Sequence, residues 1–212
     1  MELLKLKNTI GKLLILKKET LRALEPNENS LNENIKYWLK KGELIQLKKG
    51  VYVLKDRWEK ENQKELYLEY LAAILIAPAY LSLEYVLDKY QILSEPVMAL
   101  TLITSKSTRE ISNQLGVFRY YSITPDLFCG YRTKYFIDAP IREAPKEKAL
   151  FDYIYLRFLK NEAITKEAIE NLRFNWENIS QKEFQKAASF LKFTPSKKIK
   201  KSFEMIKKLY YA

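Results

Sequence analysis

Residues 30–53 read SLNENIKYWLKKGELIQLKKGVYV, and this stretch decides the fold. Ser30 and Glu33 have capping-box spacing, in which each side chain satisfies a free backbone N–H at a helix start. Apolar residues then recur on one helical face: Leu31, Ile35, Trp38 and Leu39. Gly42 suits the left-handed conformation that ends a helix. The stretch therefore predicts a helix that begins at Ser30 and ends near Gly42.

The residues after Gly42 predict a two-stranded ribbon, because apolar residues flank Lys48-Lys49-Gly50, a plausible hairpin tip. Upstream, residues 3–16 and 17–24 have helical patterns, with Thr20 as a candidate cap of the second helix. Residues 26–29, Pro-Asn-Glu-Asn, indicate a turn. Helices followed by a basic hairpin predict a winged helix-turn-helix domain over residues 1–58.

The rest of the chain predicts a mixed α/β domain over 59–160 and a basic helical extension over 161–212. Residues 56–63 are charged and indicate a linker or a helix start. Helices are expected over 64–77, 82–89 (capped by Ser82), 145–160, 166–172, 181–191 and 196–211. Strands are expected over 97–104, 109–112, 117–123 and 135–143, the last broken by Pro140. The expected fold class is therefore α+β.

The charge balance favours a polyanionic partner. The 212 residues carry 37 basic and 26 acidic side chains, a net charge of +11. Residues 1–60 hold 14 basic and 8 acidic residues, 61–160 hold 12 of each, and 161–212 hold 11 and 6. The two ends are therefore basic, and we expect them to meet the polyanion.

The composition bears on chemistry and location as well. Histidine, the commonest general base and metal ligand, is absent, and Cys129 is the single cysteine. We expect no metal, no cofactor and no enzymatic activity. Lysines interrupt the apolar residues of the N-terminus, and Pro78 interrupts the longest apolar run, residues 70–81. We therefore expect a cytoplasmic protein without a signal peptide or a membrane segment.

The outer face of the residue-30 helix is a candidate surface for reading DNA. Asn can pair with adenine in the major groove, and Lys can reach guanine or phosphate. The candidate residues are Asn32, Asn34, Lys36, Tyr37 and Lys40. The alternative is an ordinary solvated helix face.

Five further cations are candidates for contacting the DNA backbone. Lys48 and Lys49 at the hairpin tip suit phosphate or minor-groove contact. Lys17, Lys18 and Arg22 lie near the second helix, which crosses the backbone in such domains. The alternatives are a charged turn that keeps the ribbon soluble and a second solvated helix face.

Other clusters have a chemical and a structural interpretation. Lys197, Lys198, Lys200 and Lys201 open the last helix and could meet DNA, an acidic partner or only water, while Ile199, Phe203, Ile206 and Tyr210 form its apolar stripe. Glu147 and Asp152 could act as an acid–base pair, but their five-residue spacing does not place them well on one helical face. Ion pairing within Lys146, Glu147, Lys148 and Asp152 is therefore favoured. Cys129 is interpreted as a packed residue.

Four segments resemble the AbiEi family of antitoxins from type IV toxin–antitoxin systems. They are KKGVYV (48–53), AYLSLEYVLDKYQILSE (79–95), ALTLITSKSTREISNQLGVFRYYSITPDLFCGY (99–131) and APKEKALFDYIYLR (144–157). The resemblance covers about residues 5–160. A winged helix alone is a weak marker, whereas the ordered run of the three later segments is more specific.

The resemblance implies a transcriptional repressor with a second role in phage defence. In the family, the winged helix binds inverted repeats of double-stranded DNA in its own promoter. The C-terminal part counteracts a nucleotidyltransferase-like toxin of the AbiEii type, with or without a direct complex. Two rival classes are a stand-alone transcription factor whose second domain dimerises or senses a ligand, and a nucleic-acid-processing enzyme. Missing histidines and metal motifs argue against the enzyme.

Overall fold

The computed structural model describes residues 7, 9, 11–159 and 163–211. The protein has an α+β fold with a three-stranded and a six-stranded sheet among these residues. The chain divides into two compact units. Unit 1 comprises residues 1–71 and 111–117, and unit 2 comprises residues 72–110 and 118–212. The predicted boundary at residue 58 thus falls inside unit 1.

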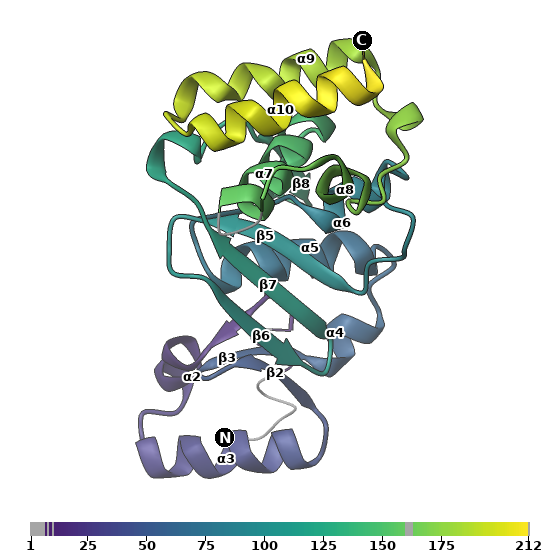
Figure 1. Ribbon diagram of the computed structural model, residues 1–212. Coiled ribbons are helices and arrows are strands. Elements are labelled where there is room, and N and C mark those ends of the chain that lie inside the picture. Colours follow the sequence, from purple (N-terminus) through teal and green to yellow (C-terminus); the bar gives the residue numbers. More distant parts are fainter. Residues whose placement is uncertain (1–6, 8, 10, 160–162, 212) are drawn as a thin grey trace. The chain divides into compact units, whose positions relative to one another are not determined.

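Unit 1 is built on helix α3 and the hairpin that follows it (Figure 1). Its elements are β1 (Leu16–Lys17), α2 (Lys18–Leu24), α3 (Glu28–Lys40), β2 (Leu44–Lys48), β3 (Val51–Leu54), α4 (Lys55–Glu59) and the first part of α5 (Lys64–Leu75). The sheet order is β1-β3-β2, with antiparallel pairing throughout. The predicted helix and hairpin are therefore both present.

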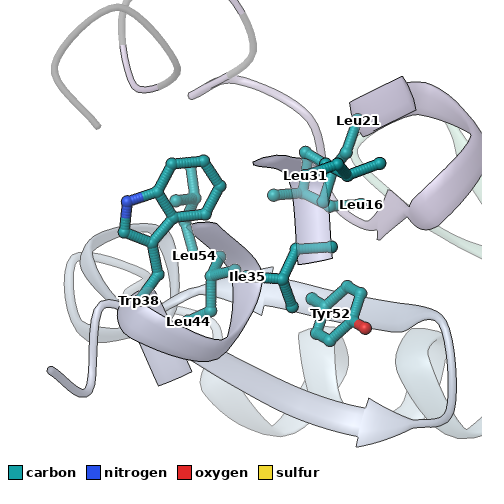
Figure 2. Packing of buried hydrophobic residues seen from close by; sticks show 8 residues of the cluster. All are labelled: Leu16, Leu21, Leu31, Ile35, Trp38, Leu44, Tyr52 and Leu54. Carbon is teal, nitrogen blue, oxygen red and sulfur yellow. The ribbon is translucent and has the colours of Figure 1, made fainter. Parts of the chain in front are cut away.

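The apolar face of α3 forms the centre of the unit 1 core. Figure 2 shows Trp38 and Ile35 of α3 pointing toward the hairpin residues Leu44, Tyr52 and Leu54. Leu16, Leu21 and Leu31 complete the cluster, and Leu39 packs against it partly buried. The predicted apolar face is confirmed, and it fixes which side of α3 meets solvent.

Three residues set the start of α3, the end of α3 and the turn of the hairpin. Asn27 is the N-cap, because its side-chain oxygen accepts the Ser30 N–H at 3.0 Å. Gly42 ends the helix with φ +68°, and Gly50 turns the hairpin with φ +76°. These conformations suit glycine, which has no Cβ to clash. The expected roles of both glycines are confirmed.

Three predictions in unit 1 are wrong in detail. The capping box at Ser30 and Glu33 does not form, because Asn27 caps the helix one turn earlier and Ser30 lies within it. Thr20 is not a cap, because α2 already begins at Lys18. The helix expected over 3–16 does not reach Leu16, which pairs with Tyr52 in the sheet. Residues 3–6, 8 and 10 of that helix lie outside the described residues.

Unit 2 contains the larger sheet, in the order β6-β7-β5-β4-β9-β8. The strands are β4 (Ala79–Leu81), β5 (Ala99–Thr104), β6 (Arg109–Asn113), β7 (Gly116–Ser122), β8 (Arg132–Phe136) and β9 (Ala139–Glu143). The tip of the β6–β7 hairpin, residues 111–117, is grouped with unit 1. The predicted strands over 97–104, 109–112 and 117–123 are confirmed.

Unit 2 also contains the helices α6 to α10, of which α9 and α10 pack on α7 (Figure 1). The helices are α6 (Glu84–Lys89), α7 (Lys146–Leu159), α8 (Lys166–Glu170), α9 (Gln181–Ser189) and α10 (Lys197–Tyr210), with short 3-10 turns at Pro125–Leu127, Trp176–Asn178 and Phe190–Phe193. Phe203 of α10 packs on Phe184 of α9 and on Phe151 of α7, with ring centroids 5.6 and 5.7 Å apart. The four helices predicted after residue 144 are therefore present.

Three features of unit 2 differ from the sequence predictions. Residues 135–143 belong to two strands, because Ile137 adopts φ +56° in a turn and Pro140 pairs with Tyr135 in the resulting hairpin. Ser82 is not a cap, because α6 begins at Glu84 and the Ser82 hydroxyl is used elsewhere. Strand β4 was not expected at all.

Candidate nucleic-acid interface

Helix α3 presents a polar outer face opposite its buried stripe. At about 100° per residue, Lys36 and Lys40 lie opposite Leu31 and Trp38. Asn32, Lys36, Tyr37 and Lys40 are exposed, whereas Asn34 is half-buried. Asn32 and Asn34 fall on opposite flanks of the helix, so α3 does not gather all five candidates on one surface.

Two contacts hold side chains on this outer face. The Lys36 ammonium lies 3.9 Å from the Glu33 carboxylate, and both side chains are largely exposed. Such a surface pair contributes little, so Lys36 remains available to an anion. The Lys41 ammonium lies 5.8 Å from the centroid of the Tyr37 ring, and Tyr37 is 56% exposed. The face therefore carries an exposed ring as well as cations.

The hairpin tip collects lysines from two distant segments of the chain. Strand β1 pairs with β3, which sets Lys17 opposite Val51. The Lys18 N–H then donates to the Gly50 carbonyl at 2.9 Å. Lys17 and Lys18 consequently lie beside the segment that carries Lys48 and Lys49. The sequence suggested the same four lysines but did not indicate that they meet.

Glu28 partly neutralises this basic cluster, and the sequence analysis missed it. Its carboxylate accepts hydrogen bonds from the Lys18 ammonium and, at 2.9 Å, from the Arg22 guanidinium. The hydrogen bond from Arg22, followed by that from Lys18, lowers the pKa of Glu28 to about 2. Glu28 falls in the segment expected to be a turn, so nothing in the local pattern pointed to this role. Lys18 and Arg22 are therefore paired candidates for phosphate contact.

If unit 1 binds DNA as the sequence predicts, changing Glu28 to Gln should strengthen that binding by freeing Lys18 and Arg22 for phosphate. We expect the slope of log affinity against log salt to steepen by about one to two units. The measurement is a DNA-binding titration at several salt concentrations. Glu59→Gln is the matched control, because Glu59 pairs with Lys55 at 3.5 Å and lies outside the candidate surface. Equal slopes for the two variants would contradict a phosphate role for Lys18 and Arg22.

The same variant should change the response of unit 1 to acid. The folded-state pKa of Glu28, about 2, lies below its ordinary value of 4.5. Its stabilising contribution is therefore present above pH 4.5 and is lost as the pH falls toward 2. The stability difference between the native chain and Glu28→Gln should accordingly shrink between pH 5 and pH 2, as denaturant titrations would show.

In unit 2, the Lys148–Asp152 pair lies in a buried polar cluster. Both side chains are 0% exposed. Asp152 accepts hydrogen bonds from the Lys148 ammonium, from the Tyr80 hydroxyl at 2.9 Å and from the Ser82 hydroxyl at 2.8 Å. Lys148 also donates to the Leu127 carbonyl at 3.0 Å. Burial raises the pKa of Asp152 despite these contacts.

This cluster supports the structural interpretation of the 144–157 segment. Glu147 faces Lys186 at 3.6 Å, and Lys146 faces Glu183 at 2.7 Å. Glu147 and Asp152 thus have separate partners and do not form an acid–base pair. The cluster joins β4, α7 and the Pro125–Leu127 turn, and its two charged groups are closed to water. Tyr80, which lies in the unexpected strand β4, is the member that the sequence analysis missed.

The C-terminal helices α9 and α10 carry a concentrated positive charge. Residues 181–211 contain nine lysines and two acidic residues, Glu183 and Glu204. Ile199, Phe203 and Ile206 are buried as predicted, while Tyr210 is 37% exposed and stacks on Trp176 at 4.6 Å. Lys197, Lys200 and Lys201 are exposed. Lys198 is half-buried, so three of the four lysines named from the sequence face solvent.

Cys129 is half-buried, and its thiol lies 3.5 Å from the Asp126 carbonyl. Within residues 7, 9, 11–159 and 163–211, no cluster of three His, Cys, Asp or Glu residues could hold a metal ion. No helix in the described part of the chain is long and apolar enough to cross a membrane.

Comparison with known proteins shows that no family model and no curated protein matches the chain.

Proposed function

We propose that unit 1 binds double-stranded DNA as a winged helix, with α3 in the major groove and the β2–β3 tip on the backbone. The observation that carries the proposal is the gathering of Lys17, Lys18, Lys48 and Lys49 at one hairpin tip. Phosphate contacts of this kind position a protein on the duplex, and base contacts from the helix give specificity. Lys36, Tyr37 and Lys40 are the residues of α3 that can read bases or reach phosphate.

Changing Lys48 and Lys49 together to Ala should weaken binding to the DNA upstream of the protein's own gene. Two lost phosphate contacts should reduce the salt slope by about two units, across all sequences tested. The matched control is Lys60→Ala with Lys64→Ala, which removes the same charge from unit 1 outside the candidate surface. Unchanged affinity and slope in the hairpin variant would overturn the placement of the wing on DNA.

The finer proposal is that the protein is a cytoplasmic antitoxin and autorepressor of a type IV toxin–antitoxin operon. The resemblance of residues 48–53, 79–95, 99–131 and 144–157 to the AbiEi family supports it. Unit 2 would counteract a nucleotidyltransferase-like toxin, and no catalytic residue is assigned to it. Exposed lysines of α9 and α10 offer unit 2 a surface for an acidic or nucleic-acid partner.

Co-expression separates the two halves of this proposal. The full chain should restore growth to cells that express a nucleotidyltransferase-type toxin encoded by the adjacent gene. The Lys48→Ala, Lys49→Ala variant should still restore growth while it no longer represses the promoter. Absence of such a gene, or absence of rescue, would favour the second candidate, a stand-alone regulator. The observation that favours this candidate is a pocket of about 420 Å³ in unit 2, which a sensing domain requires.

A further inference from the structure

The pocket in unit 2 has the size and lining of a small-molecule site. It lies between the C-terminal half of α7, the end of β7 and the start of α6, and its volume of about 420 Å³ suits a compact organic ligand. The residues that give it chemical character are Glu84, Tyr121, Tyr153, Leu156, Arg157 and Leu159. None of them belongs to the candidate DNA surface, so DNA binding by unit 1 does not account for the pocket.

Glu84 is the unusual member of this lining. Its Oε2 atom is buried and has no hydrogen-bond partner within the described part of the chain. Burial raises the pKa of Glu84, against hydrogen bonds to its own backbone N–H and to the Thr101 side chain, so it is the Oε2 atom alone that lacks a partner among the described residues. A buried polar atom without a partner costs free energy, and a donor that supplies the missing hydrogen bond removes that cost.

The side chain of Glu84 can be reached from two sides. A second pocket of about 340 Å³ shares Glu84 and Tyr153 with the first, so these two residues lie in the wall between the pockets. A ligand that enters either pocket therefore approaches the carboxylate group whose Oε2 lacks a partner. The first pocket is the better candidate, because Tyr121 and Leu156 add aromatic and apolar lining.

The charged side chains near Glu84 indicate which kind of ligand group would donate a hydrogen bond to it. Arg157 lines the pocket, and Arg119, which is paired with Glu110 at 2.8 Å outside the lining, also acts on Glu84. Two guanidinium groups disfavour a cationic ligand, so the donor should be a neutral N–H group. Tyrosine rings stack on planar heterocycles, and Arg donates to the carbonyl and ring nitrogen of guanine.

We propose that this pocket binds a purine nucleobase of the guanine type, with its N–H edge on Glu84, its opposite edge toward Arg157, and Tyr121 and Tyr153 along its faces. The inference is independent of DNA binding by unit 1 and of toxin antagonism. It gives unit 2 a ligand that would be a free nucleoside or nucleotide, whose sugar extends toward solvent.

Calorimetric titration of the full chain with guanosine tests the proposal. We expect saturable binding, at least about tenfold weaker binding to Glu84→Gln, and none to Leu156→Trp, in which the indole fills the pocket. Glu177→Gln, the same change at an exposed position of unit 2, should bind like the native chain. Benzamidine, a planar cation, should not bind. Equal affinity of the native chain and Glu84→Gln for guanosine, or binding of benzamidine alone, would overturn the assignment.

A second measurement uses only the native chain, in case the pocket variants fail to fold. Guanosine should slow hydrogen exchange of backbone amides in residues 119–122 and 153–159, the two segments that carry Tyr121, Tyr153 and Leu156 of the lining, and leave residues 31–54 unchanged. Absence of protection in both lining segments at saturating guanosine would also reject the site. Protection of residues 31–54 alone would place the nucleoside on unit 1 and reject it as well.

Discussion

Changing Asp152 to Ala should destabilise unit 2 by about 3–5 kcal/mol, a large share of the stability of a typical domain. The change leaves the Lys148 ammonium buried without a carboxylate, hydrogen-bonded to the Tyr80 hydroxyl at 3.1 Å and the Leu127 carbonyl at 3.0 Å. It also removes the acceptor of the Tyr80 and Ser82 hydroxyls. Denaturant titration followed by circular dichroism would measure the loss.

Two further variants identify the cause of that loss. Lys148→Met with Asp152→Asn removes both charges but keeps an oxygen that accepts from the two hydroxyls. We expect this double variant to recover most of the lost stability, because replacing a buried ion pair is often nearly neutral. Lys186→Ala, which breaks the more exposed pair with Glu147, should cost under about 1 kcal/mol. A cost for Asp152→Ala no larger than for Lys186→Ala would contradict the role of the buried cluster.

Changing Trp38 to Ala should destabilise unit 1 by about 3–5 kcal/mol and, with it, abolish the proposed DNA binding. Trp38 is 2% exposed and belongs to the cluster that includes Leu44 and Leu54 of the hairpin, as Figure 2 shows. The lost indole leaves a cavity where α3 meets the sheet. Hydrogen exchange in residues 31–54, together with DNA titration, would report both effects.

The neighbouring residue provides the matched control. Tyr37 is 56% exposed, so Tyr37→Ala should change stability by no more than about 0.5 kcal/mol. If Tyr37 contacts DNA as proposed, the same variant should still bind DNA more weakly than the native chain. Stability unchanged by Trp38→Ala would show that α3 is not held by this core, and the proposed presentation of its outer face would fail with it.

Sequence patterns predicted the structure correctly where it depends on residues that are close together in the chain. The spacing of Leu31, Ile35 and Trp38 identified the buried face of α3, and Gly42 and Gly50 identified the helix end and the hairpin tip. The start of α3 was less determined, because Asn27 and Ser30 are both good caps and lie three residues apart. The structure uses Asn27, which adds a turn and carries Glu28 into the helix.

Sequence patterns did not predict contacts between residues that lie far apart in the chain. Strand β1 has two residues, and its pairing with Tyr52 and Val51 across more than 30 positions leaves no periodic signal. Ion pairing near Asp152 was anticipated, since Lys148 lies four residues earlier on the same helix. The Tyr80 and Ser82 hydroxyls come from about 70 residues away, so only the folded chain assigns them to Asp152. The DNA-reading residues are still a prediction from residue type and exposure.

The hydrogen bond from the Lys18 N–H to the Gly50 carbonyl has a consequence for the evolution of the β2–β3 hairpin. Because it ties the hairpin tip to the first residue of α2, the tip is preorganised, and DNA binding would lose less conformational entropy there than with a free loop. The same tie limits length variation. A residue inserted between Lys48 and Val51 would move Gly50 away from α2, so related chains should keep this turn at two residues even where its side chains differ.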